Sequence, residues 1–365
     1  MRTHLVTGFP GFIGRRLVAA LLERGPEDGV IALVEPRMVL AARTAAAELG
    51  GGARLEILEG DITLPRLGLG EDRYRRLAAE VAVVHHLAAI YDLAVPEAVA
   101  QLVNVDGTGN VVTFCRDVER LERLNYVSTA YVAGDRTGVV YEHELNLGQG
   151  FKNHYESTKF QAEVWVRSAM DDVPTTIFRP AIVVGDSRTG ETQKFDGPYY
   201  ALRFIAASAA RGMAAANIGR GAVPFNVVPV DFIVEAMVEL GRSEEAIGEA
   251  LHLCDPAPLS SQEMFGLLTE LYPAKQASYR VPPSVVAAAL RIGPIRKMYG
   301  GTPPQSIRYL NHPVRYDTRR ATELLAASGL RCPGFAEYAP AMVAFFRAHE
   351  DDPAFAPVPV AGRGR

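Results

Sequence analysis

Short apolar runs alternate with longer amphipathic stretches through roughly the first half of the chain. The apolar runs cover residues 5–7, 30–34, 55–58, 81–89, 124–129 and 175–178. Short runs that are apolar on both faces are typical of strands in a parallel sheet. The stretches between them, such as residues 15–23, repeat their apolar positions every three or four residues and predict helices. This alternation predicts an α/β fold, a doubly wound parallel sheet of the Rossmann type.

The pattern changes after Gly185. Residues 199–210 and 335–349 predict helices, residues 225–231 and 251–253 predict strands, and the segment from Pro256 onward is mostly helical. We therefore expect a dinucleotide-binding Rossmann domain over residues 1–185, with a strand and a helix returning to it from about residues 222–255. Residues 186–350 would form a smaller mixed substrate-binding region. Residues 351–365 are rich in Pro, Ala and Gly and are expected to be disordered.

A glycine-rich turn separates the first predicted strand from the first predicted helix. Gly8, Gly11 and Gly14 follow the strand at a spacing of three. Glycines lack the Cβ atoms that would block a ligand, and a helix N-terminus carries partial positive charge and unpaired N–H groups. Because the turn lies at the first strand-to-helix crossing, it predicts a pyrophosphate site rather than a simple turn.

Polar residues after the next two strands bear on the choice of cofactor. Glu35 ends the second strand, where an acid usually pairs with the ribose hydroxyls of NAD. Arg15, Arg37 and Arg43 could instead meet the 2′-phosphate of NADP. The sequence leaves NAD(H) and NADP(H) open, with a slight lean to NADP(H). Asp61, after the third strand, could touch an adenine amine or cap a turn.

The fourth apolar run ends in two small residues, Ala88 and Ala89, which leave room for a cofactor. His85 and His86 precede them, and adjacent residues of a strand point to opposite faces. Two such histidines make a poor metal pair, so no metal site is expected.

Tyr155 and Lys159 are the main candidates for chemistry. Residues four apart on a helix lie on one face, one turn apart. A nearby ammonium lowers a tyrosine pKa that is ordinarily near ~10, which makes the phenol a usable proton donor or acceptor. Thr129, at the end of the fifth strand, could hold the substrate oxygen and share the proton. Asn104, a polar residue on a packed helix, could hold a backbone carbonyl or a water behind the site.

Composition narrows the compartment and the partners. The chain has 365 residues, 48% hydrophobic and 22% charged, with a net charge of −4, so neither nucleic acid nor an anionic membrane is expected as a partner. Cys115, Cys254 and Cys332 lack metal-ligand spacing and are expected to be reduced thiols. The amino terminus has no signal-peptide core, and no apolar run is long enough to span a bilayer, so a cytoplasmic protein is expected.

Several motifs occur together, in the order seen in extended short-chain dehydrogenase/reductases. They are Thr7-Gly8-x-x-Gly11-x-x-Gly14, Gly60-Asp61-Ile62, His86-Leu87-Ala88-Ala89, Asn104-Val105-x-Gly107-Thr108, Ser128-Thr129-Ala130-Tyr131, Tyr155-x-x-x-Lys159 and Arg179-Pro180. Over residues 1–185 the chain resembles that family. Residues 127–134, 151–156, 185–190 and 228–232 are similar to its thioester-reductase and fatty-acyl-reductase branch.

Two features depart from that branch. Its members often have arginine at the end of the second strand, where this chain has Glu35. They are also often fused to adenylation and carrier domains, for which this chain has no room.

The resemblance implies site residues. Thr129, Tyr155 and Lys159 would be the catalytic trio, with Asn104 as a fourth candidate. Thr129 is preferred to Ser128 because the family's catalytic hydroxyl lies five residues before the glycine that corresponds to Gly134. The implied cofactor contacts come from the glycine turn and the ends of later strands: Gly8, Phe9, Gly11, Phe12, Ile13, Gly14, Arg15, Glu35, Arg37, Asp61, Ile62, Leu87, Ala88, Ala89, Tyr155, Lys159, Arg179, Pro180 and Ile182.

The resemblance also implies an activity: NAD(P)H-dependent reduction of a carbonyl or acyl thioester to an aldehyde or alcohol, with the acyl group on CoA or a carrier protein. Alternatives with the same fold are a nucleotide-sugar epimerase or dehydratase and a hydroxysteroid-type alcohol dehydrogenase. Ala130 and Tyr131 stand where such dehydratases have acidic residues, which counts against dehydration. A third alternative is a non-catalytic cofactor-binding regulator. A homodimer is expected, formed by the helices after Val95 and from Tyr155.

Overall fold

The computed structural model describes residues 2–91, 95–218, 221–298, 307, 309 and 312–355. At the centre lies a seven-stranded parallel sheet in the order β3-β2-β1-β4-β5-β7-β11. Its strands are β1 (Thr3–Thr7), β2 (Gly29–Val34), β3 (Leu55–Glu59), β4 (Val83–His86), β5 (Arg123–Val127), β7 (Thr175–Pro180) and β11 (Ala250–Leu253). The prediction of a doubly wound parallel sheet is therefore confirmed.

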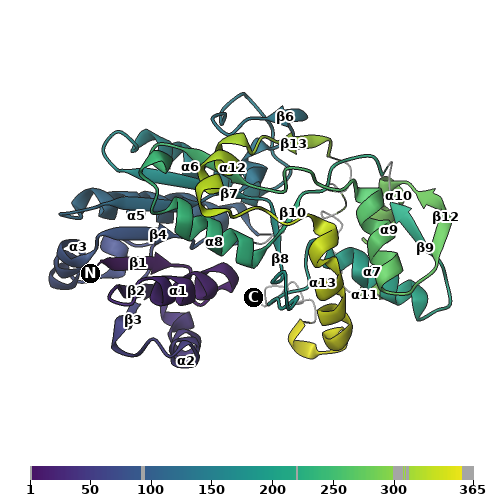
Figure 1. The fold of residues 1–365 in the computed structure, drawn as a ribbon, viewed down its shortest axis with the longest axis horizontal. Helices are drawn as coiled ribbons and strands as arrows, with labels where there is room; N and C mark the ends of the chain where they lie inside the picture. The colour runs from purple at the N-terminus through teal and green to yellow at the C-terminus, as the bar shows by residue number, and fades with distance from the viewer. Residues whose placement is uncertain are drawn as a thin grey trace.

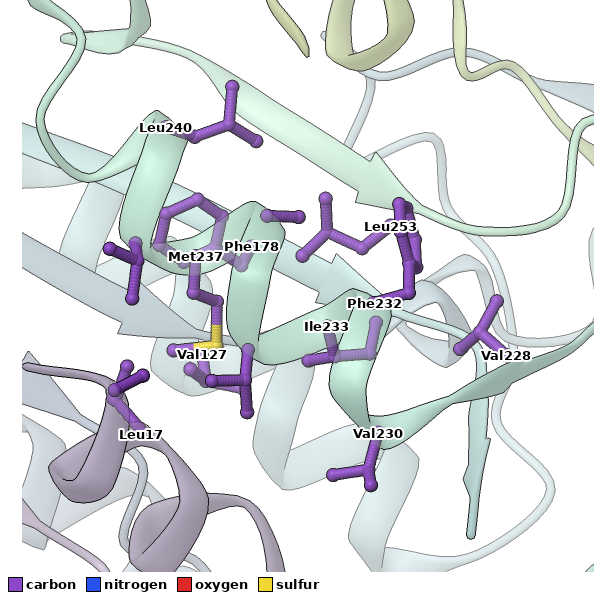
Figure 2. Packing of buried hydrophobic residues seen from close by; sticks show 14 of the residues in the cluster. Leu17, Val127, Phe178, Val228, Val230, Phe232, Ile233, Met237, Leu240 and Leu253 are labelled. Carbon is purple, nitrogen blue, oxygen red and sulfur yellow. The ribbon is translucent and has the colours of Figure 1, made fainter. Parts of the chain in front are cut away.

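Helices cover both faces of this sheet, and each face has its own apolar core. The helices are α1 (Phe12–Arg24), α2 (Val39–Leu49), α3 (Glu71–Glu80), α4 (Glu97–Ala100), α5 (Gly107–Asp117), α6 (His154–Ser168) and α8 (Val230–Leu240). One core joins α1, α2 and α8 to the sheet, and the other joins α3, α5 and α6. In Figure 2, Ile233 and Met237 of α8 point at Val127 and Phe178 of the sheet, with Leu17 of α1 beside them.

Most of the remaining helices gather at the far end of the molecule from the sheet (Figure 1). They are α7 (Tyr199–Ala209), α9 (Ser261–Leu271), α10 (Pro283–Ala289), α11 (Gly293–Met298) and α13 (Phe335–His349), whereas α12 (Arg319–Leu325) packs on α8 and β11 beside the sheet. Three further parallel strand pairs lie outside the central sheet: β8 (Ile182–Val184) with β10 (Val227–Pro229), β9 (Ala215–Ile218) with β12 (Gln276–Val281) in the far lobe, and β6 (Gly138–Val140) with β13 (Val314–Tyr316) against the sheet core. A third core, built from α7, α9 and α13, supports the far lobe.

The chain crosses between the two regions more than once. After α7 and β9 it returns to supply α8, which lies against α1, and then β11, which forms the edge of the sheet beside β7. The segment after Pro256 leaves the sheet again and returns to it with α12, which packs on α8 and β11. Among the described residues, no helix is both long and apolar enough to cross a bilayer.

The structure corrects two expectations. The segment after Pro256 is not helical throughout, because β12 pairs with β9 within it. Disorder from residue 351 was also expected, but Pro353–Phe355 form a helical turn in which the Phe355 ring stacks on Phe195 with centroids 4.5 Å apart. This aromatic contact anchors a stretch whose composition alone suggests disorder. Residues 356–365 lie outside the described part of the chain.

Candidate active site

The predicted site residues meet at the carboxyl edge of the central sheet. Gly8 follows β1, Leu87 follows β4 and Thr129 follows β5, and parallel strands deliver all three ends to one edge. From β1 the chain proceeds outward through β2 and β3 on one side, and through β4, β5 and β7 on the other. The crevice between β1 and β4 is thus the point where ligands bind in open α/β sheets.

The glycine turn leaves no room for side chains. Gly8 has a φ of 90°, and a Cβ there would lie 2.9 Å from the amide nitrogen of Ala88. A Cβ on Gly14 would lie 2.5 Å from the carbonyl oxygen of Gly8, and one on Gly11 would lie 2.8 Å from the same oxygen. Among the described residues, no side chain caps the start of α1 at Gly11. Open N–H groups in a cradle that a Cβ would fill fit the pyrophosphate of a dinucleotide.

We expect Gly14→Ala to weaken dinucleotide binding about ten- to a hundredfold, because the new methyl group meets a backbone oxygen that cannot rotate away. Gly109→Ala is the matched control, since a Cβ at this α5 position meets nothing within 4 Å. Calorimetric titration with NADPH and NADH checks both variants. Equal affinity for the two variants would contradict the pyrophosphate assignment.

The residues flanking this turn differ in their burial. Phe9 is buried, while Phe12 and Ile13 are half-buried in the first turn of α1. The Arg16 guanidinium lies 4.6 Å from the centre of the Phe12 ring. Leu87 and Ala88 line Gly8 on the β4 side, and Ala89 is half-buried next to them.

Charged residues at the end of β2 are already paired with one another. Glu35 follows β2 and forms an ion pair with Arg37, and both side chains face solvent. Arg15 bonds to Glu48 of α2 at 2.8 Å. The Glu35 carboxylate could accept hydrogen bonds from the ribose hydroxyls of NAD. The Arg37 guanidinium could instead bind the 2′-phosphate of NADP.

The Asp61 side chain forms hydrogen bonds within its own turn. Its Oδ1 accepts hydrogen bonds from the Thr63 amide at 2.8 Å and from the Thr63 hydroxyl at 2.7 Å, which is a turn-capping arrangement. The neighbouring Ile62 is buried against Gly107. Of the two roles open for Asp61, the turn role therefore has direct structural support.

Thr129 lies close enough to the Tyr155 phenol to act on its pKa. Asn153 starts α6 by accepting from the Glu156 amide at 3.0 Å, which places Tyr155 in the first turn. Burial raises the pKa of Tyr155 to about 12, although Thr129 acts in the opposite direction. Tyr155 is thus protonated at neutral pH and is equipped to donate a proton.

Lys159 lies one turn further along α6 and is buried. Its ammonium donates to the Tyr126 hydroxyl at 2.9 Å and to the Val127 carbonyl oxygen at 2.7 Å. Burial lowers the pKa of Lys159 to about 7, against an opposing effect of Glu163. The expected lowering of the Tyr155 pKa is wrong for this structure, because burial dominates and the ammonium is directed at Tyr126 and Val127.

Asn104 lies in a π-helical turn (Gln101–Asp106) between α4 and α5. Its Oδ1 accepts from the Ile90 amide at 2.8 Å, and its Nδ2 donates to the Thr158 hydroxyl at 3.0 Å. The amide therefore ties the loop after β4 to α6 beside Lys159. This geometry makes Asn104 a positioning residue.

Behind the site lies a charge cluster that was not anticipated. Glu163 and Arg179 are both fully buried, and Arg179 donates to the two Glu163 oxygens at 3.0 and 2.6 Å. The Ser128 hydroxyl donates to Glu163 at 2.6 Å, and Arg167 donates at 3.0 Å. Ser128 is therefore a supporting residue, and its neighbour Thr129 faces Tyr155.

This cluster corrects the cofactor role expected for Arg179. Its Nη1 donates to the carbonyl oxygen of Glu142 at 3.0 Å, and its Nη2 also donates to the carbonyl oxygen of Glu144 at 2.8 Å. With its donors used inside the core, the side chain has none to offer a cofactor. Pro180 is buried at the end of β7 and Ile182 is half-buried in β8, so both can offer only apolar or backbone contacts.

Aromatic rings outside the predicted set lie near the candidate hydroxyls of Thr129 and Tyr155. Tyr91 meets Tyr155 edge-on at 5.0 Å between centroids, and Tyr131 meets Tyr309 edge-on at 5.1 Å. Tyr309 in turn donates to the buried Glu156 at 2.7 Å. Tyr131 and Glu156 flank the predicted Thr129 and Tyr155 in sequence, which is the one signal that could have identified them.

Comparison with known proteins agrees with this geometry. The model of the family described as male sterility protein matches residues 6–237, well over half of the chain. A linear gramicidin synthase of Brevibacillus parabrevis is 28% identical over 275 residues, which is 69% of this chain and 5% of that protein. A carboxylic acid reductase of Segniliparus rugosus is 28% identical over 275 residues, 66% of this chain and 23% of that protein. The chain thus spans a quarter or less of these relatives.

Solved structures share the fold. The terminal R domain from the myxalamid PKS-NRPS biosynthetic pathway has a TM-score of 0.82 at 24% identity, covering 97% of this chain and 92% of that one. UDP-glucuronic acid 4-epimerase from Bacillus cereus, in complex with NAD, has a TM-score of 0.67 at 18% identity, covering 95% and 99%. With the matched family and the glycine cradle, these findings show that the chain belongs to the male sterility protein family of NAD(P)-dependent oxidoreductases, within the extended short-chain dehydrogenase/reductases.

Proposed function

We propose that this chain reduces an acyl thioester, carried on CoA or on a carrier protein, to an aldehyde, and that Thr129, Tyr155 and Lys159 form its catalytic site. The observation that carries the proposal is that Thr129, which follows β5, and Tyr155, in the first turn of α6, come together at the carboxyl edge of the sheet, where Thr129 acts on the Tyr155 phenol. Both hydroxyls can then point at one substrate oxygen. A tyrosine that stays protonated at neutral pH suits reduction, in which that oxygen gains a proton.

Each residue of the site has its own task. When bound, a reduced nicotinamide supplies the hydride to the thioester carbon. Thr129 donates a hydrogen bond to the oxygen where negative charge develops, and Tyr155 gives that oxygen its proton. The resulting hemithioacetal collapses to an aldehyde and the free thiol. Lys159, one turn further along α6 and held by Tyr126 and Val127, places its positive charge on the side of α6 from which Tyr155 acts.

The far lobe supports an anionic acyl carrier. Residues 201–230 and 273–298 contain eight arginines and lysines and no aspartate or glutamate, although the whole chain has a net charge of −4. The same lobe exposes Met213, Tyr279, Val285 and Ile292, which are 45–63% accessible. Positive charge beside apolar surface suits the phosphates and the apolar chain of an acyl phosphopantetheine.

The experiment supplies purified protein with NADPH or NADH and a panel of probes: decanoyl-CoA, acetyl-CoA, octanal and cyclohexanone. We expect decanoyl-CoA to be consumed with release of free thiol and decanal, both measured directly. Epimerase chemistry predicts instead that the protein retains tightly bound NAD and consumes no probe. Cofactor binding without turnover of any probe would support the regulator alternative and overturn the proposal.

The ion pair at the end of β2 offers a test of cofactor choice. We expect Glu35→Gln to improve affinity for NADPH over NADH about tenfold, because the carboxylate repels a 2′-phosphate and that charge is removed. Arg37→Ala should move the preference in the opposite direction, because a partner for the phosphate is lost. The ratio of Kd values for the two cofactors checks both variants. If neither variant changes the ratio of the two Kd values, the adenosine ribose does not bind beside Glu35 and Arg37.

We also propose a homodimer, through α6 and the turn between α4 and α5. Leu102 is 46% exposed, Val164 41% and Trp165 54%, so these helices present apolar side chains to solvent. Light scattering at micromolar concentration should give twice the chain mass, and Trp165→Glu should give the monomer mass. A monomeric wild-type protein would contradict this proposal.

Two further points remain proposals. We assign residues 1–185 with 222–255 to the dinucleotide-binding domain and residues 186–350 to the substrate-binding region. We place the activity in the cytoplasm, where Cys115, Cys254 and Cys332, all free thiols here, stay reduced.

A further inference from the structure

A chain of buried polar side chains leads from Lys159 into the sheet. Lys159 donates to the Tyr126 hydroxyl, and the Thr108 hydroxyl lies near enough to act on the Tyr126 phenol. The Thr108 oxygen also lies 3.0 Å from His86 Nε2, while His86 Nδ1 lies 2.7 Å from the Thr7 hydroxyl. Thr7 is the last residue of β1, immediately before Gly8. All five side chains are at most 3% exposed.

The donor of each hydrogen bond around His86 can be assigned from the partners of Thr7. The Thr7 oxygen accepts from the amides of Leu87 and Ala88, both at 3.2 Å, so its own hydrogen must go to His86 Nδ1. His86 is then the neutral tautomer with hydrogen on Nε2, which it donates to Thr108. Burial, with a smaller effect of Lys159, lowers the pKa of His86 to about 3, in keeping with a neutral ring.

Donors can also be assigned toward the Lys159 end. Thr108 gives its hydrogen to the Asn104 carbonyl oxygen at 2.6 Å. Lys159 can only donate, so the Tyr126 oxygen accepts from the ammonium. The Tyr126 hydroxyl thus lies between the ammonium and Thr108.

Tyr126 therefore holds the ammonium in two ways. Its hydroxyl accepts an ammonium hydrogen, and the centre of its ring lies 4.5 Å from Lys159 Nζ, within the range of a cation–π contact. Both interactions favour the charged amine. We propose that Tyr126 is a positioning residue that fixes the charged amine of Lys159 beside Tyr155 and joins it, through Thr108 and His86, to the start of the glycine turn.

Few other ionisable groups act on Lys159. Glu163 lies one turn along α6 and favours the charged amine, but it is itself paired with Arg179 and Arg167. His86 on β4 is neutral, and Tyr155 on α6 is protonated at neutral pH. Loss of the Tyr126 hydroxyl should thus show directly in the titration of the amine.

The test compares wild type, Tyr126→Phe, Thr108→Val and Tyr74→Phe. Tyr74 is the matched control, because it is also a buried tyrosine whose hydroxyl donates one hydrogen bond, to Asp117 at 2.6 Å. Neither residue of that hydrogen bond belongs to the network around Lys159. The chain has only five lysines, Lys152, Lys159, Lys194, Lys275 and Lys297, so a lysine-selective carbon-13 label gives few signals to follow by NMR. Lys159→Met identifies the Lys159 signal.

We expect Tyr126→Phe to lower the titration midpoint of Lys159 by about one pH unit, because a hydrogen bond to the charged form is lost. Thr108→Val should lower it by less, and Tyr74→Phe should leave it unchanged. The inference rests on the proposed function for its kinetic part. With decanoyl-CoA as probe, kcat falls as pH rises through the Lys159 pKa, and this fall should begin about one pH unit lower in Tyr126→Phe, with KM little changed.

A Tyr126→Phe protein whose lysine titration matches that of Tyr74→Phe overturns the inference. Circular dichroism and thermal unfolding show whether each variant is folded. If Tyr126→Phe is misfolded, the Lys159 titration in Thr108→Val tests the inference instead. If no probe is turned over, the proposed function fails while the lysine titration still decides the role of Tyr126.

Discussion

Tyr155→Phe is expected to lower kcat for decanoyl-CoA about 10²- to 10⁴-fold, the usual worth of a positioned proton donor. The phenol is protonated at neutral pH because burial raises its pKa to about 12, so the wild-type enzyme always has a proton to give. Phenylalanine keeps the ring edge-on to Tyr91 and removes only the donor hydroxyl. KM should change little. Steady-state kinetics with NADPH measure both constants.

A control separates loss of the proton from loss of structure. Tyr338→Phe also removes a buried hydroxyl, one that donates to the Val227 carbonyl oxygen at 2.9 Å in the far lobe, and should keep near wild-type turnover. Thr129→Ser should retain most activity and Thr129→Val should lose most of it. Near-normal turnover by Tyr155→Phe with a verified substrate would refute the proposed mechanism.

Glu163→Gln is expected to lower the free energy of unfolding by about 3–5 kcal/mol, because it leaves the buried guanidinium of Arg179 without its counter-charge. Burial alone would raise the pKa of Glu163, but Arg179, Arg167 and Ser128 outweigh it and lower the pKa. A lowered carboxylate pKa adds stability above the unfolded pKa, and this stability is lost as pH falls through the folded pKa. The difference in unfolding free energy between wild type and Glu163→Gln should therefore become smaller at acidic pH.

Urea unfolding across a pH series measures this difference. Glu48→Gln is the control, because its partner Arg15 lies at the surface and an exposed pair is worth at most about 1 kcal/mol. Equal losses in the two variants would show that the Glu163 cluster contributes no more than a surface pair. Turnover should also fall in Glu163→Gln, because Ser128 loses the acceptor that fixes the backbone next to Thr129.

The sequence predicts the central sheet well for a physical reason. Strands buried on both faces tend to be short and apolar, and six of the seven strands of the sheet lie in the first half of the chain, where short strand-like segments alternate with helical ones. The residues of β10 were predicted as a strand, but the pairs β6–β13 and β8–β10 join segments far apart in sequence, so no local pattern reveals which strands pair. The docking of Phe355 likewise depends on Phe195, which periodicity cannot reveal.

For the candidate site, too, local features could be predicted from the sequence and features that depend on the whole fold could not. The spacing of Tyr155 and Lys159 and the strand end at Thr129 are local features, and the structure brings these residues to one edge of the sheet. The pKa of Tyr155 was mispredicted because burial is a property of the whole fold. The Tyr126 network and the Glu163–Arg179 pair each join several elements, so their members look like ordinary strand or helix residues in the sequence.

The return of α8 and β11 to the sheet has a consequence for engineering. A chain cut after Gly185 would strip α1 of the apolar cover that α8 gives it and leave the edge of β7 open to other chains. Grafting another relative's substrate specificity onto this scaffold therefore requires two separate stretches to be exchanged together, one on each side of residues 222–255. A single-crossover chimaera would instead exchange α8 and β11 of the dinucleotide domain along with the specificity.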